Sequence, residues 1–94
     1  MEPYTKVFDW MSRLPAEERL VYALIYQLTK NGLGFFGTAK TLSDRLNIPK
    51  SRCKGYLEHL EEIGAVEIVR QTILRKERRV FVATDAFAEQ LQNE

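Results

Sequence analysis

The lysines and arginines of this 94-residue chain are concentrated in two short segments that could bind an anion. Residues 40–54 and 70–79 hold ten of the fourteen basic residues and only two acidic ones, Asp44 and Glu77, so together they carry a formal charge of +8. The rest of the chain sums to −7, which hides this asymmetry in a net charge of +1. Clustered cations of this kind favour an anionic partner for one surface, whereas a total near zero disfavours indiscriminate binding to any polyanion.

Other patterns that could do chemistry are weaker. Residues 32–37 match the spacing G-x-G-x-x-G, but they follow a predicted helix rather than a strand, so helix-ending and turn glycines explain them better than a dinucleotide site. Glu58, Glu61 and Glu62 lie on the exposed side of a predicted helix, without an apolar pocket that would raise a carboxyl pKa. His59 has no second histidine or cysteine at ligand spacing. We therefore expect no enzyme, no metal site and no cofactor.

The composition predicts a single domain over residues 1–94. An apolar fraction of 45% and a charged fraction of 29% are ordinary for a globular protein. No stretch approaches the roughly 20 apolar residues of a membrane span, and the amino terminus lacks the layout of a signal peptide, so we expect a cytoplasmic protein without a membrane partner. Cys53 is the only cysteine and lies in an apolar helical pattern, which favours a reduced, buried thiol.

Helical periodicity dominates the first two thirds of the chain. Residues 1–14 form an N-terminal extension, in which residues 4–11 have the spacing of a short helix. A leucine-rich stripe predicts a first long helix over residues 15–30, which Asn31 and Gly32 end. Residues 38–64 contain two more helices: a short one capped by Thr38 and running to residue 46, and a longer one that begins near Pro49 and ends before Gly64.

The last third of the chain changes to a strand pattern. Runs of β-branched residues at 66–69 and 80–82 predict an antiparallel hairpin over residues 65–84, with residues 71–79 as a long loop between the strands. Phe35 and Phe36 are enough for one short strand that pairs with a sheet edge. Asp85 is expected to cap a last helix within residues 85–94. The expected fold class is α+β, mostly α.

A short helix, a three-residue turn, a longer helix and a hairpin are the parts of a winged helix-turn-helix, with a three-helix core, a hairpin wing and short terminal helices. In that fold the longer helix enters the major groove by its N-terminal half. Cys53, Leu57 and Leu60 define its core face, and we expect Arg52 to point sideways toward a phosphate strand. The predicted DNA-binding residues are Thr38, Lys40, Lys50, Ser51, Arg52, Lys54 and Gly55 on the helices and Arg75, Lys76, Arg78 and Arg79 on the wing.

The sequence also resembles a known family. The segments that carry the resemblance are Phe8-Asp9-Trp10-Met11, residues 19–26, Phe36-Gly37-Thr38, Leu42-Ser43 and residues 57–66. From residue 4 to about residue 84 the chain looks like the winged helix-turn-helix domain of plasmid and phage replication initiators, including DnaD-like proteins, and of related bacterial regulators. The resemblance implies that residues 50–54 face the DNA groove and that the wing contacts the DNA backbone. One departure is Pro49, where similar domains usually have a serine or threonine cap.

These observations favour a protein that binds double-stranded DNA and serves in transcription regulation or DNA replication in a bacterium, plasmid or phage. The alternative is a winged helix that docks a protein partner, because a fold alone does not specify function. Two explanations also remain for the aromatic residues. Either the N-terminal segment packs on the first long helix, or a homodimer forms through Trp10, Tyr22, Tyr26, Phe87 and Leu91.

Overall fold

A central helix, α1 (Ala16–Lys30), organises the structure, a computed structural model that describes residues 7–32 and 34–93, with the side chain of Ile73 excepted. Val21, Leu24 and Ile25 on this helix are fully or almost fully buried, as the leucine-rich stripe predicts. Gly32, with a φ of 86°, follows the end of the helix in the left-handed region that glycine adopts readily. The predicted helix over residues 15–30 is therefore confirmed to within one residue.

The N-terminal segment forms a short 3-10 helix, η1 (Asp9–Arg13), rather than a helix at residues 4–11. Residues 4–6 of that prediction lie outside the described residues. The Arg19 guanidinium donates hydrogen bonds to the carbonyl oxygens of Ser12 and Leu14 at 2.9–3.1 Å, which satisfies carbonyl groups at the end of η1. Met11 is completely buried, so this segment closes one side of the core.

Helices α2 (Ala39–Leu46) and α3 (Lys50–Glu62) are joined by a turn at residues 47–49. The Thr38 hydroxyl accepts a hydrogen bond from the Thr41 amide, and the Thr41 hydroxyl accepts one from the Thr38 amide, which confirms the predicted cap. Asn47 takes a left-handed conformation with a φ of 57°, and the second helix starts directly after Pro49. Both helices bury their apolar faces in one core, with Leu42, Ile48, Cys53, Leu57 and Leu60 among its members.

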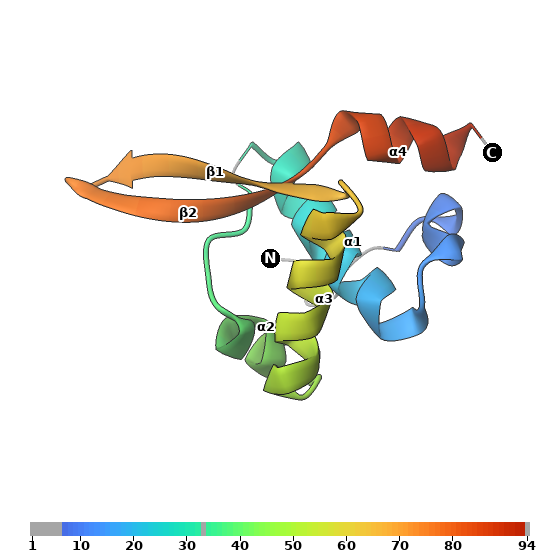
Figure 1. The fold of residues 1–94 in the computed structure, drawn as a ribbon, viewed down its shortest axis with the longest axis horizontal. Helices are drawn as coiled ribbons and strands as arrows, with labels where there is room; N and C mark the ends of the chain where they lie inside the picture. The colour runs from blue at the N-terminus through green and yellow to red at the C-terminus, as the bar shows by residue number, and fades with distance from the viewer. Residues whose placement is uncertain (1–6, 33, 94) are drawn as a thin grey trace.

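The hairpin differs from its predicted form. Strands β1 (Val66–Ile73) and β2 (Lys76–Ala83) pair along their full length, and only Leu74 and Arg75 form the turn. The expected long loop at residues 71–79 is therefore wrong. A strand is recognised in sequence by alternating apolar and polar residues, which show that one of its faces is buried. Residues 76–79 have no such alternation, because this end of the hairpin extends beyond the core and both of its faces are exposed. Main-chain pairing alone continues the ladder there, and Figure 1 shows this end of the hairpin pointing away from the helices.

A β-bridge attaches the hairpin to the segment before α2. Phe35 pairs with Phe81 through two main-chain hydrogen bonds of 2.7 and 2.8 Å, as the short strand prediction implies. Gly34 makes this approach possible, since a Cβ there would lie only 2.7 Å from a methyl group of Val80. At the other end of β2, helix α4 (Asp85–Gln92) follows, with Thr84 rather than Asp85 at its N-cap position. The fold is thus α+β and mostly helical, with one two-stranded antiparallel sheet.

No helix within the described part of the chain is both long enough and apolar enough to cross a membrane.

Candidate functional site

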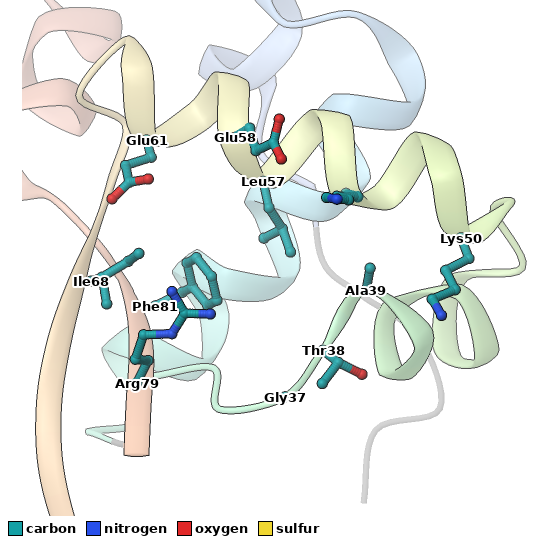
Figure 2. Close-up of a pocket in the computed structure, with 11 residues that line it drawn as sticks. Gly37, Thr38, Ala39, Lys50, Leu57, Glu58, Glu61, Ile68, Arg79 and Phe81 are labelled. Atoms are coloured by element: carbon teal, nitrogen blue, oxygen red, sulfur yellow. The ribbon is translucent and has the colours of Figure 1, made fainter. Parts of the chain in front are cut away.

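A groove of about 380 Å³ lies between α3, the start of α2 and the base of the hairpin. Leu57, Ile68 and Phe81 form part of its wall, and Figure 2 shows the side chains of α3 above the segment at residues 37–39. The groove is lined by Gly37, Thr38, Ala39, Lys50, Lys54, Leu57, Glu58, Glu61, Ile68, Arg79 and Phe81. Segments far apart in the sequence therefore meet at one concave surface.

The α3 side of this groove changes charge along the helix. Lys50, Lys54, Glu58 and Glu61 follow one another at spacings of four and three residues, which places them on one stripe of the helix. The two lysines occupy the N-terminal half and the two glutamates the C-terminal half. The groove is therefore positive at the end near α2 and contains carboxylates toward the other end of α3.

Arg79 brings the second basic segment into the groove. On β1 and β2 it stands directly opposite Arg70, a like-charge pair that would weaken a sheet. Glu77, diagonal to Arg70, accepts a hydrogen bond from its guanidinium at 3.0 Å. This ion pair engages Arg70, while Arg79 and Phe81 line the groove.

A second hollow of about 270 Å³ adjoins the first and shares four of its residues: Gly37, Thr38, Arg79 and Phe81. Phe36 and Arg78 complete its lining. Phe36 is 50% exposed, although an aromatic residue next to the core would ordinarily be covered. The sequence analysis did not single out Phe36 as a site residue, and its only signal was a second phenylalanine directly after Phe35.

Six of the predicted cations have no carboxylate partner within residues 7–32 and 34–93. They are Lys50, Lys54, Arg75, Lys76, Arg78 and Arg79. Lys40, in contrast, lies 3.9 Å from Asp44 in a weak i, i+4 pair. Arg75 and Lys76 lie at the tip of the hairpin and do not line the groove. Ser51 and Gly55 are exposed on α3 but also lie outside the groove lining.

Arg52, which was expected to point sideways toward a phosphate strand, forms an ion pair within the chain while its side chain stays 59% exposed. Its guanidinium binds the Glu17 carboxylate of α1 at 3.1 Å and 3.2 Å. The Tyr56 hydroxyl donates a further hydrogen bond of 2.6 Å to the same carboxylate. These contacts attach the N-terminal half of α3 to α1, so the role of Arg52 in this structure is to position the helix.

The contacts within this cluster shift the pKa values of Glu17 and Tyr56. The hydrogen bond from Tyr56 and the contact with Arg52 lower the pKa of Glu17, against an opposing effect of partial burial. The pKa of Tyr56 is raised in turn, mainly because its proton is held by the Glu17 carboxylate. At neutral pH the cluster therefore holds an ionised carboxylate between a protonated phenol and a guanidinium.

His59 is also engaged, although the sequence gives it no metal-binding partner. Its Nδ1 lies 2.7 Å from Oε2 of Glu18, a residue of α1 that is only 3% exposed. Sequence reasoning missed Glu18, because an acid in the first turn of a helix is ordinarily a solvated residue. Among the described residues, no three histidine, cysteine, aspartate or glutamate side chains gather closely enough to hold a metal ion.

The aromatic residues mostly pack within the chain. Trp10 contacts Tyr22 and Tyr26 edge to face, with ring centroids 6.1 and 5.1 Å apart, and Phe87 packs against Tyr22 at 5.6 Å. Packing of the N-terminal segment on α1 is therefore confirmed. Tyr22 is completely buried, so it belongs to no surface, whereas Trp10, Tyr26, Phe87 and Leu91 keep partial exposure.

Comparison with known proteins finds no protein family, no curated protein and no solved structure that matches this chain.

Proposed function

We propose that this chain is a winged helix-turn-helix domain that binds double-stranded DNA. The observation that carries the proposal is the meeting of the two basic segments: Lys50 and Lys54 of the first line the same groove as Arg79 of the second. Glu58 and Glu61 line the same groove but form no ion pair with these three cations in the described residues, so the groove keeps an excess of positive charge. A phosphate backbone would supply the missing counter-charge.

The order and dimensions of the elements support the same proposal. Helix α3, with 13 residues, is about 20 Å long at 1.5 Å per residue and presents Lys50 and Lys54 in its exposed first half. The major groove admits such a helix, and a lysine there can reach the acceptor atoms of guanine. Each strand of the hairpin has 8 residues and spans about 26 Å, enough to bring Arg75 and Lys76 to the backbone beside the groove.

The start of α2 provides a further phosphate contact. Its first turn contains no acidic residue, and its N-terminal amides and Lys40 lie next to Thr38 at the rim of the groove. Helix N-termini bind anions through free amides and the helix dipole. Thr38 would thus fix the orientation of the domain on the backbone, while residues of α3 read base edges.

The acidic half of α3 favours a second candidate, a protein partner. Glu58 and Glu61 line the groove and would repel phosphates, so duplex contact is confined to the N-terminal half of the helix. A basic segment of another protein would instead pair with these glutamates. A homodimer through the partly exposed Trp10, Tyr26, Phe87 and Leu91 is compatible with either candidate.

Binding to duplex DNA, measured by fluorescence anisotropy over a salt series, tests the proposal. If the four unpaired cations of the hairpin contact phosphates, the slope of log K against log salt is about −4, at about −0.9 per contact. Arg79→Glu is expected to reduce the slope by about one, whereas Lys54→Glu is expected to lower affinity by removing a base contact. Lys30→Glu is the control, because Lys30 ends α1, lies 3.6 Å from Asp85 and does not line the groove.

A slope near zero, or equal losses for the control and the groove variants, would contradict DNA binding through this surface. Lys54→Ala separates the two roles, since a residue that contacts bases alters the preference among sequences more than a hairpin variant does. Binding that requires Glu58 and Glu61 and ignores DNA would favour the protein partner. DNA binding of this kind would suit either transcription regulation or replication initiation.

A further inference from the structure

The tip of the hairpin carries the most exposed large apolar side chain among the described residues. Leu74 is 91% exposed, whereas Phe36, Val7 and Ile63 reach 50%, 39% and 39%. A leucine in this position buries almost nothing in the folded chain. Asparagine, aspartate or glycine would suit the solvated turn better.

The backbone at the tip makes this choice of residue more unusual. Leu74 and Arg75 have φ values of 52° and 65°, and the paired residues on either side, Ile73 and Lys76, close a two-residue turn between them. A turn with two positive φ values is ordinarily occupied by asparagine, aspartate and glycine. Backbone conformations that disagree with the residue type tend to occur at functional sites.

The surroundings of Leu74 are strongly cationic. Arg75, Lys76, Arg78 and Arg79 have no carboxylate partner within the described residues, and the acid of this part of the hairpin, Glu77, is bound to Arg70. Among the described side chains, the tip therefore combines the exposed Leu74 with several cations around it. Its partner must offer an apolar slot inside a dense array of negative charge.

We propose that Leu74 inserts between stacked base pairs from the minor groove and bends the duplex. This inference rests on the proposed DNA binding and adds a class of substrate, DNA with an easily unstacked step. Stacked bases supply the apolar slot and the flanking phosphates supply the charge, and apolar wedges of this kind kink DNA by about 20–90°. Pyrimidine–purine steps unstack most readily and are the expected sites.

The position of the tip agrees with this role. The distal half of the hairpin projects away from the helices, so no other element shields Leu74 from a duplex (Figure 1). The two strands pair continuously, from Val66 opposite Ala83 to Ile73 opposite Lys76. This pairing holds the projecting end of the hairpin in one register. A lipid surface offers a similar combination of charge and apolar interior, but one leucine is too small an anchor, because even a single long acyl chain holds a protein only reversibly.

Two measurements on the full chain test the inference: energy transfer between dyes at the ends of a duplex, which reports bending, and the fluorescence of 2-aminopurine at a TA step, which reports unstacking. Wild type is expected to raise both. Leu74→Asn should lose both signals and weaken binding by about tenfold to a hundredfold, the change expected for one leucine side chain no longer buried. Asparagine is compatible with the positive φ at this position, so the hairpin itself remains folded.

Leu74→Met is the matched control, since methionine also serves as a wedge and should keep most of the signal. Wild-type binding without unstacking or bending would overturn the inference and leave DNA binding in place. Equal signals from Leu74→Asn and wild type would overturn it as well. No binding to any duplex would instead overturn the proposed function on which it rests, and tip-dependent binding to anionic phosphatidylserine vesicles alone would show that the partner is a membrane.

Discussion

Gly34→Ala is expected to destabilise the protein strongly, because Gly34 is where the hairpin meets the body of the domain. Its φ of 71° lies in the left-handed region, where an alanine costs about 1–2 kcal/mol. A Cβ at this position would also lie 2.7 and 2.9 Å from methyl groups of Val80 and Val82 and 3.1 Å from the carbonyl oxygen of Phe81. Val80 is completely buried and has little room to move.

The backbone cost and the steric clash together determine how much stability Gly34→Ala loses. Overpacking of a well-packed site costs about 1–3 kcal/mol, so the total for Gly34→Ala is about 2–5 kcal/mol. For a domain of this size each kcal/mol lowers Tm by about 4–8 °C, and a loss of about 3 kcal/mol therefore lowers it by about 12–24 °C. Such a loss is a large part of the total stability of a small domain, which is about 5–15 kcal/mol.

Gly32→Ala is the control that separates these two effects. Gly32 also has a positive φ, 86°, but a Cβ there would meet nothing within 4 Å. This variant therefore reports the conformational cost alone, about 1–2 kcal/mol. Urea and thermal unfolding followed by far-ultraviolet circular dichroism measure both variants. If Gly34→Ala costs no more than Gly32→Ala, then the hairpin is not packed on Gly34 and the reasoning is wrong.

Three further outcomes are expected. Gly55→Ala should raise the free energy of unfolding by about 0.5–1 kcal/mol in urea titrations, because Gly55 lies in a helix interior with open space around it; an accompanying loss of DNA affinity would show that the backbone of α3 approaches the duplex closely. Glu17→Gln should make the stability of the protein depend less on pH in acid. The folded-state pKa of Glu17 is lowered, so the ionised carboxylate stabilises the fold at neutral pH, and this stabilisation is lost as the pH falls through that pKa. Urea unfolding midpoints between about pH 5 and pH 3 should therefore fall less in the variant than in wild type. The Cys53 thiol should react slowly with a thiol reagent at about pH 8 until denaturant is added. Burial raises the pKa of this thiol, and the nearby Glu17 carboxylate raises it further. Rapid reaction of the native protein would contradict the buried position of Cys53.

The helices could be predicted because their signals are local. The Thr38 cap, the turn at residues 47–49 and the apolar spacing of Leu57 and Leu60 each act within a few residues, and the structure contains all of them. The strand at residues 76–79 could not be recognised in the same way. Its side chains are all exposed, so no alternation marks it, and only main-chain pairing with β1 makes it a strand.

The candidate site could be predicted only in part, because its charges depend on contacts between distant elements. Clustering in the sequence identified the basic segments, and the groove brings Lys54 and Arg79 together. Nothing near Arg52 in sequence indicates that it binds Glu17, 35 positions away. The exposure of Phe36 likewise depends on where the hairpin passes, which periodicity does not report.

The Phe35 bridge ends the pairing on the outer edge of β2 at Phe81, and from Arg79 to Lys76 that edge has no strand beside it in the described part of the chain. Open edges of this kind can add a strand from another copy and start aggregation, and positive side chains are a common protection against it. Lys76, Arg78 and Arg79 would therefore also keep the protein monodisperse at high concentration. Replacement of these residues by alanine removes this protection, whereas replacement by glutamate preserves the repulsion between copies.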